Sequence, residues 1–335
     1  MRPQSTVRAG LGLALISSVT FATSGTFARS LLGAGWSAEA AVAARVAVAA
    51  LVLAIPAAMA VRGRWRVLGR NLGPVGLFGL FAVAGAQVGF FNAVRYLPIG
   101  VALLLEYFGI VFVVLWMWAR HGQRPRLLTT LGSAAALLGL VLVLNLAAAE
   151  RIQPTGVLWG LTAAVGLATY FVLSARVDGE LPAVAFASAG MAIGAGVLFL
   201  LGLVTVVPLH ATFGPVNFAG LRMSWWIPVV GLSLLAAVVP YVAGIGAARI
   251  LGARFASFVG LTEVLFAVLI AWLLLDELPT VVQFVGGALV LAGVSLVRAD
   301  ELRLDRKPSR ARPRSDRRGA LWDPAAAEAP REVLC

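Results

Sequence analysis

Residues 95–125 read RYLPIGVALLLEYFGIVFVVLWMWARHGQRP, and residues 249–279 read RILGARFASFVGLTEVLFAVLIAWLLLDELP. The two stretches match at a constant offset of 154 residues, and the match continues beyond them without a gap. This self-similarity indicates an internal repeat. It divides the chain into a first half (1–149), a second half (150–298) and a tail (299–335). The paired residues that carry it are Arg95/Arg249, Ala102/Ala256, Phe112/Phe266, Trp118/Trp272, Pro125/Pro279, Gly132/Gly286 and Gly139/Gly293.

The composition indicates that most of this chain is solvated by lipid. Hydrophobic residues make up 60% of the 335 residues and charged residues 13%, whereas ordinary globular domains have about 45–50% and 25%. The mean hydropathy is +0.93. These values exclude a disordered protein, a nucleic-acid binder and a soluble enzyme. The net charge of +12 comes largely from arginines in short loops between apolar runs, so we expect no nucleic-acid partner.

Ten apolar runs are long enough to span a membrane, which takes about 20 mostly apolar residues. The first run follows Arg2 and Arg8 as a signal peptide would, but its many serines and threonines favour a retained helix. We therefore predict an all-α integral membrane protein with ten transmembrane helices. Because each half holds five helices, an odd number, the two repeats are inverted relative to each other. The predicted spans are 9–28, 39–61, 73–94, 99–119, 127–147, 155–175, 182–206, 226–248, 254–275 and 280–298.

The arginines predict the orientation of the chain. With a cytoplasmic N-terminus, the outer side receives only Arg29, Arg95, Arg151 and Arg222. The positive-inside rule therefore places both termini in the cytoplasm and the spans in the cell (inner) membrane. The arginines of the cytoplasmic side are then Arg2, Arg8, Arg62, Arg64, Arg66, Arg70, Arg120, Arg124, Arg126, Arg176, Arg249, Arg254 and those of the tail.

The tail is predicted to be a disordered basic segment on the cytoplasmic side, because it has four prolines and no apolar period. Between Arg303 and Arg318 it carries eight basic residues and two acidic ones. We expect it to contact anionic membrane lipid.

Two glutamates within the spans are the leading candidate site residues. Inverted repeats are typical of secondary transporters, whose binding site lies near the membrane midplane between the halves. Glu106 and Glu263 both lie about 12–14 Å deep, at 1.5 Å per helical residue, and ionisable groups at such depth usually face a cavity. Each lies three positions from the counterpart of the other at the 154-residue offset. We expect them to carry a proton or to bind a cationic group of a small-molecule substrate. The alternative for each is a neutral, structural carboxyl group.

Six further polar residues within the spans are candidates for the lining of a polar cavity. Arg45 lies six residues into the second span. At this depth its guanidinium group has three alternatives: it can snorkel to the membrane surface, bond to the end of a helix, or bind a substrate carboxylate. For the others, a hydrogen bond between helices is the alternative. They are Gln87, Asn92, Tyr107, Tyr170 and Tyr241.

Signatures of enzymes, metal sites and cofactors are absent from the sequence. The single cysteine, Cys335, excludes an internal disulfide, and His121 and His210 fall in separate loops. The only lysine, Lys307, lies in the tail, so neither a P-loop nor an intramembrane Schiff base is possible. We predict that the protein is not an enzyme and has no metal site and no cofactor.

The second half resembles a known family of transporters. Residues 255–263 read FASFVGLTE, residues 271–278 read AWLLLDEL and residues 286–287 are Gly-Gly. This pattern resembles the EamA family of the drug/metabolite transporter superfamily, whose members have ten spans in two five-helix repeats. The stretch LPIGVALLLEYFG at 97–109 is similar to the threonine/homoserine exporter branch. The resemblance implies a cavity lined by Gln87, Glu106, Tyr170, Tyr241 and Glu263. Where the family often has proline, this chain has Ile110 and Val264.

These observations predict an inner-membrane secondary transporter that exports small metabolites, with amino acids or their analogues as the leading class. Alternating access coupled to proton antiport is the hypothesis for its mechanism. An uptake carrier of the same fold is one alternative. A non-transporting sensor or scaffold that acts through the basic tail is another.

Overall fold

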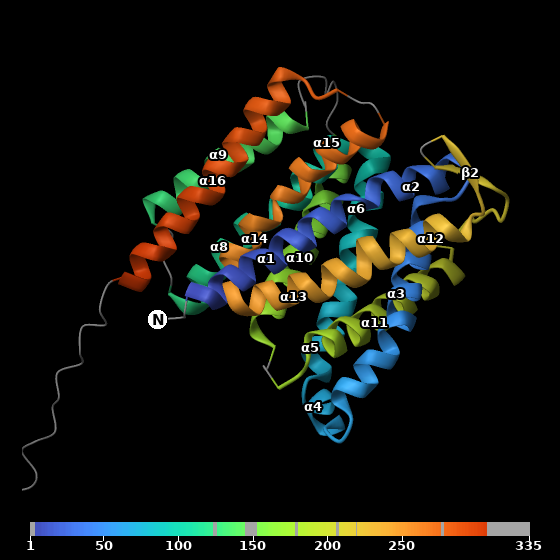
Figure 1. Cartoon of the computed structure of the whole chain (residues 1–335), viewed down its shortest axis with the longest axis horizontal. Coiled ribbons are helices and arrows are strands. Elements are labelled where there is room, and N and C mark those ends of the chain that lie inside the picture. The colour runs from blue at the N-terminus through green and yellow to red at the C-terminus, as the bar shows by residue number, and fades with distance from the viewer. Residues whose placement is uncertain are drawn as a thin grey trace, which may run out of the picture.

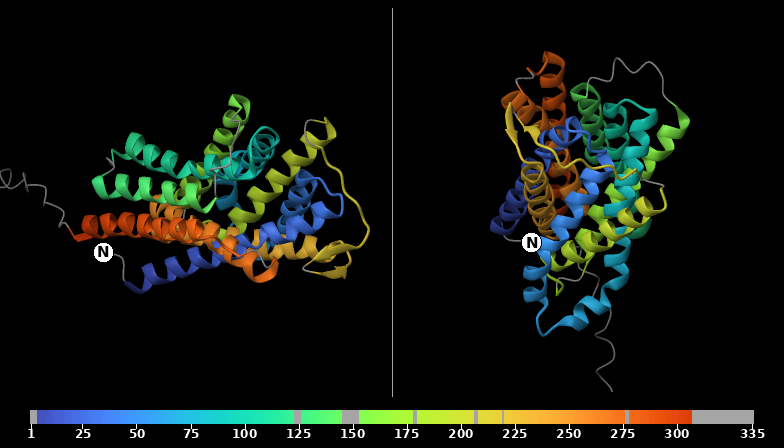
Figure 2. Two further views of the ribbon diagram at one scale, coloured as in Figure 1. Left: turned by 90° about the horizontal axis from the view of Figure 1, so that it is seen from above. Right: turned by 90° about the vertical axis from the view of Figure 1, so that its right-hand side faces the viewer.

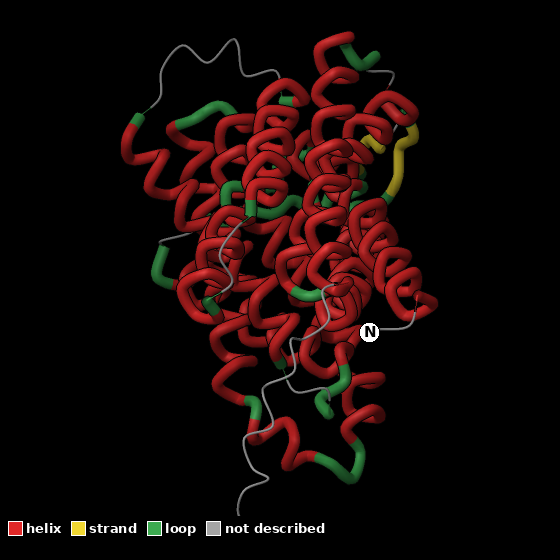
Figure 3. The backbone as a smooth tube through the Cα atoms, turned by 90° about the vertical axis from the view of Figure 1, so that its left-hand side faces the viewer, coloured by secondary structure: helices red, strands yellow, loops and turns green. Residues whose placement is uncertain are grey.

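The computed structural model describes residues 4–122, 126–144, 153–177, 180–205, 208–218, 220–275 and 278–306. Nearly all of this backbone is helical, as the tube in Figure 3 shows. The first half comprises α1 (Gln4–Ala22), α2 (Ser24–Gly33), α3 (Ala38–Val61), α4 (Trp65–Arg70), α5 (Leu72–Leu77), η1 (Phe78–Gly85), α6 (Ala86–Tyr96), α7 (Ile99–Tyr107), α8 (Gly109–His121) and α9 (Leu127–Val143).

The second half repeats this order, except that a single helix takes the place of α1 and α2 and a β-hairpin stands where the first half has α4. It comprises α10 (Pro154–Arg176), α11 (Ala183–Leu203), β1 (Val216–Phe218), β2 (Leu221–Met223), α12 (Trp226–Ser233), η3 (Leu234–Val238), α13 (Val239–Leu251), α14 (Ala253–Gly260), α15 (Thr262–Leu275) and α16 (Val281–Arg306). The antiparallel hairpin β1–β2 pairs Val216 with Met223. No strand was predicted there, so the all-α fold has one short β insertion.

The predicted spans are confirmed as membrane helices. Among the described residues, nine helical stretches are long and apolar enough to cross a membrane, and Leu127–Val143 is a shorter apolar helix at the fifth span. The last apolar stretch, Val281–Asp300, agrees with the predicted span 280–298. Residues 299–306, predicted as the start of the disordered tail, are instead helical, because α16 continues to Arg306. Its Asp300 is 2% exposed and accepts a hydrogen bond of 2.7 Å from the Thr129 hydroxyl, which ties this extension to α9. The rest of the predicted tail, 307–335, lies outside the described residues.

The helices of the two halves pack mainly across the repeat boundary. The most extensive contacts join α9 with α16, α3 with α11, α1 with α13 and α6 with α10. Figure 1 shows α9 and α16 side by side along one edge of the molecule. Each half therefore completes its packing with helices of the other half.

Glycines at repeat-related positions allow the crossing of α9 with α16. On α9 and α16, a Cβ on Gly139 would lie 2.5 Å from the carbonyl oxygen of Gly286, and one on Gly293 would lie 2.5 Å from that of Gly132. Each of these contacts becomes the other when the two halves are exchanged. The helices therefore cross antiparallel about a pseudo-two-fold axis, as expected for inverted repeats.

The first helix of each half also packs on the third span of the opposite half. Gly10 of α1 lies against Ile250 and Leu251, and Gly156 of α10 lies against Tyr96 and Leu97.

Both repeats interrupt the same two spans. The third span contains the π-helical segment η1 and the eighth contains η3, at nearly equivalent positions. The fourth span is divided between α7 and α8 at Phe108, and the ninth between α14 and α15 at Leu261. These divisions occur although Ile110 and Val264 stand where the family often has proline. π-Helical turns and divided spans are frequent near functional sites.

The bundle has two unlike ends, which Figure 2 shows in its left panel. We call the end at which α1 begins and α16 ends the basic face, because Arg8, Arg62, Arg64, Arg66, Arg70, Arg120 and Arg126 lie there. We call the opposite end, which carries β1–β2, the hairpin face.

Candidate functional site

A cavity of about 860 Å³ lies between the two halves. Its walls come from α1, α2, α3, η1, α6, α7, α10, α12, α13, α14, α15 and neighbouring residues of both repeats. Apart from a few polar groups, the lining is alanine, phenylalanine, leucine and valine. Seven of the eight predicted site residues line it: Arg45, Gln87, Glu106, Tyr107, Tyr170, Tyr241 and Glu263.

The cavity extends from the middle of the bundle toward the hairpin face. Near that face it is lined by Ala28 and Leu32 of α2, Ala38 of α3, and Ile99 of α7. Toward the basic face it ends against helices that pack tightly, with Ala247 1% exposed. The structure is therefore open at the hairpin face and closed at the basic face.

Arg45 lies in the interior of α3 and lines the cavity. It is 5% exposed, so the snorkelling alternative is wrong. Its guanidinium carbon lies 5.4 Å from the centre of the Phe21 ring. Charge–charge interactions connect it with Glu106 and Glu263. The Nε atom is buried and has no hydrogen-bond partner among the described residues.

The two glutamates lie where the fourth and ninth spans are divided. Glu106 is in the last turn of α7, and Glu263 is in the first turn of α15. Tyr107 of the fourth span interacts with the Glu263 carboxyl group of the ninth. The charged neighbour of Glu106 is Arg45.

Aromatic side chains form one wall of the cavity. The rings of Tyr170 and Tyr241 meet edge-on with centroids 5.5 Å apart, and the fully buried Phe78 packs behind them, 5.7 Å from Tyr170 and 6.3 Å from Tyr241. Phe21 lies 6.5 Å from Tyr241 and so links this cluster to Arg45. The wall combines apolar faces with two hydroxyl groups, which suits a small ligand that has both polar and apolar parts.

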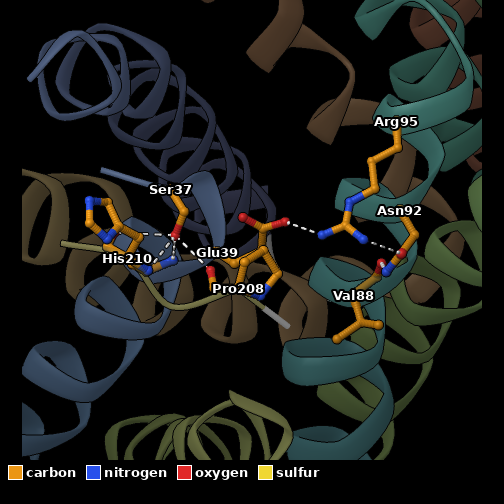
Figure 4. Close-up of polar contacts among 8 residues, drawn as sticks. Ser37, Glu39, Val88, Asn92, Arg95, Pro208 and His210 are labelled. Carbon is orange, nitrogen blue, oxygen red and sulfur yellow. Dashed lines mark hydrogen bonds and ion pairs between the residues drawn. The ribbon is translucent and has the colours of Figure 1, made fainter. Parts of the chain in front are cut away.

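Asn92 does not line this cavity. Its amide nitrogen donates to the Val88 carbonyl at 2.8 Å, and its amide oxygen accepts a bond from Arg95 at 3.4 Å. Arg95 in turn forms an ion pair of 3.1 Å with Glu39 at the start of α3, as Figure 4 shows. Asn92 therefore belongs to a polar contact at the hairpin face.

Sequence reasoning missed three serines of the cavity wall, Ser17, Ser18 and Ser24. The Ser17 hydroxyl donates to the Pro240 carbonyl at 2.8 Å, so it joins α1 to α13. The signal was present in the serine- and threonine-rich first span, which was read only as evidence against a signal peptide.

Metal-binding groups do not assemble in the described part of the chain. No set of three or more His, Cys, Asp or Glu side chains with suitable placement is found there. The His210 main chain bonds to Ser37 at the hairpin face, and the side chain of His121 lies outside the described residues.

A many-helix membrane bundle, with a cavity between inverted halves that is apolar apart from a few charged and hydroxyl groups, defines a multi-pass membrane transporter. The model of the EamA-like transporter family matches residues 8–145 and 154–299, one match for each half. The chain belongs to this family, so the resemblance seen in the sequence is confirmed. Members of the family are transporters and not enzymes.

Known relatives are similar to this chain over much of its length. An uncharacterized transporter of Archaeoglobus fulgidus is 27% identical over 227 residues, which cover 67% of this chain and 75% of the relative. The uncharacterized transporter YdfC of Bacillus subtilis is 29% identical over 198 residues, or 58% of this chain and 61% of that relative. A crystal structure with 20% sequence identity and a TM-score of 0.68 covers 90% of this chain and 99% of its own, and so shows the same fold.

Proposed function

We propose that this transporter exports small metabolites, with amino acids or their analogues as the leading class, across the cell (inner) membrane. The observation that carries the proposal is the cavity between the halves, which holds Arg45 together with Glu106 and Glu263 in an apolar surrounding. A basic and an acidic group in one small cavity are suited to a ligand that carries both charges. The similarity of residues 97–109 to the threonine/homoserine exporter branch supports the same class.

The basic face is proposed to lie in the cytoplasm. Most loop arginines are there, and the positive-inside rule favours that side. In this orientation the hairpin face is outside, and the structure is the outward-open state of an alternating-access cycle. Export then requires a second state that is open at the basic face.

Proton antiport is proposed to drive export. A proton that enters the outward-open cavity and binds Glu106 displaces the cationic group of the substrate. The protonated carrier then returns to the cytoplasmic side. Efflux that is unaffected when the proton gradient is collapsed would contradict this coupling.

The first experiment is a metabolite survey of cells that overexpress the wild-type protein, the Glu106→Gln variant or an empty vector. We expect at least one amino acid or analogue to move outward with the wild type and not with Glu106→Gln. Glu39→Gln is the matched control, because Glu39 does not line the large cavity, and it should export like the wild type. No difference among the strains at equal membrane expression would contradict the export proposal, and accumulation inside the cells would favour uptake.

A scaffold that acts through the tail is the remaining alternative, and truncation tests it. The cut belongs after Arg306 rather than after residue 298, because Asp300 is buried against Thr129. A transporter should keep its activity without residues 307–335. Loss of activity in a correctly inserted truncated protein would favour the tail-dependent alternative.

A further inference from the structure

Arg45 is a buried cation whose hydrogen-bonding capacity is unused by the described residues. It lies seven residues after the first residue of α3, which is about 10 Å into the span. Arg249, another arginine of the bundle, donates from Nη1 to the Leu181 carbonyl at 2.7 Å. Arg45 makes no hydrogen bond of this kind to the described residues, and its Nε is buried without a hydrogen-bond partner among them. Its described contacts are the Phe21 ring and the charges of the cavity.

A buried guanidinium is stabilised best by an anion that accepts paired hydrogen bonds. Glu106 and Glu263 supply charge near Arg45 but no hydrogen bond to it among the described residues. Glu263 also interacts with Tyr107. The planar fork of Arg45 is therefore open to a carboxylate in the cavity, and that geometry is the one that an arginine recognises with two parallel bonds.

The charges of the cavity then fit one kind of ligand. A carboxylate on Arg45 leaves Glu106, which lines the same cavity, available for an ammonium group. A molecule with both groups on a short carbon skeleton satisfies both side chains at once. An amine without a carboxylate leaves Arg45 buried and unpaired, which is costly.

We propose that Arg45 binds the carboxylate of the substrate and makes the transporter select amino acids over the amines that they yield on decarboxylation. This inference rests on the proposed function, which supplies the amino-acid class. Arg45 is then the specificity-determining residue for the carboxylate, and Glu106 is the partner of the ammonium group.

The test uses the purified full-length protein and measures ligand binding by the shift in its thermal unfolding. The probes are a panel of L-amino acids, the amines formed by their decarboxylation, and carboxylic acids with the same side chains but no amino group. For the amino acid that binds best, we expect the matching amine to bind the wild type at least about 100-fold more weakly, since a site built for a polar group rejects a ligand that lacks it.

Variants of Arg45 separate binding from structure. Arg45→Gln should lower the affinity for the amino acid to that of its amine and leave the amine's affinity unchanged, while Arg45→Lys should fall between Arg45→Gln and the wild type. Arg95→Gln, outside the large cavity, is the control and should bind as the wild type does.

The outcomes distinguish the two proposals. Equal binding of amino acid and amine by the wild type would overturn the role of Arg45, and this comparison needs no variant to fold. Equal loss of both ligands in a folded Arg45→Gln would also overturn it. If only the carboxylic acids without an amino group bind, and their binding depends on Arg45, the role of Arg45 is supported. The proposal that the substrates are amino acids is then contradicted. Absence of binding by all three probe sets would contradict both proposals.

Discussion

At the basic face, α10 packs against α13 and α14, and the Tyr170 hydroxyl lies directly against Gly244. The repeat-related segment, α1 and its continuation α2 toward the hairpin face, makes no comparable contact with α6 or α7 among the described residues. The cavity opens in the space between them. Repeat-related pairs of helices are therefore in contact at the basic face and apart at the hairpin face.

This difference shows how one sequence pattern can specify two states. The contacts shared by both halves, such as the glycine crossing of α9 and α16, are those that need not change. The contacts made by only one half are those that must exchange when the cavity opens to the other side. In the second half, α10 lies against Gly244 and Gly260. At the 154-residue offset, the counterparts of these glycines are Phe90 and Glu106. Closing the hairpin face would therefore bring the segment around Ser24 toward Phe90 and Glu106.

The largest expected effect is a difference in accessibility between the two ends. In a Cys335→Ser background, which has no other cysteine, a cysteine at Ala267 in the cavity wall should react with a water-soluble maleimide. A cysteine at Ala248, which is fully buried at the basic end, should react at least about tenfold more slowly, equivalent to roughly 1.4 kcal/mol. The cysteine-free protein gives the background. Equal labelling at both sites would contradict a closed basic face.

The next effect is an inversion of that difference by Gly244→Val. A side chain at this position meets the Tyr170 hydroxyl, and overpacking of this kind costs about 1–3 kcal/mol. The substitution should separate α10 from α13, raise labelling at Ala248 and lower it at Ala267. Gly196→Val is the control, because a Cβ at Gly196 meets nothing within 4 Å. Unchanged labelling in Gly244→Val would show that this contact does not close the basic face.

A third prediction concerns the contact in which the two halves agree. Gly139→Val and Gly293→Val each push a side chain into the backbone of the facing helix. Both should lower the free energy of unfolding in detergent by a similar amount, about 1–3 kcal/mol, as measured by denaturant titration. A large effect of one substitution and none of the other would contradict the pseudo-two-fold crossing.

The smallest effect is expected from the paired arginines at the two ends. Arg95 is 45% exposed in its ion pair with Glu39, so Arg95→Gln should cost only about 0.2–1 kcal/mol. Its counterpart Arg249 bonds to a partly buried carbonyl, and Arg249→Gln should cost about 1.5–3 kcal/mol. The same denaturant titration compares them, and the reverse order would show that the hairpin face is the more firmly held end.

The sequence was sufficient to predict the spans because the thickness of a bilayer fixes the length of an apolar helix. The repeat likewise predicted that Glu106 and Glu263 would come to one cavity, where the structure finds them. The hairpin β1–β2 was not predicted, since three-residue strands leave little periodic signal. The closed end was beyond sequence reasoning, because the repeat pattern is shared by both halves and does not indicate which end of the cavity is open. The cavity prediction for Asn92 was wrong because a polar side chain near the end of a span can either line the cavity or form hydrogen bonds at the hairpin face, as Asn92 does.

The packing of Gly10 on Ile250 and Leu251 has a consequence for biosynthesis. The first helix made by the ribosome finds its partner only when nearly three quarters of the chain has been synthesised. Gly156 is the reverse case, since Tyr96 and Leu97 are already in place when α10 emerges. At about 5–20 residues per second, the roughly 240 residues between Gly10 and Ile250 take on the order of 10–50 s to synthesise, and α1 stays without this partner for that time.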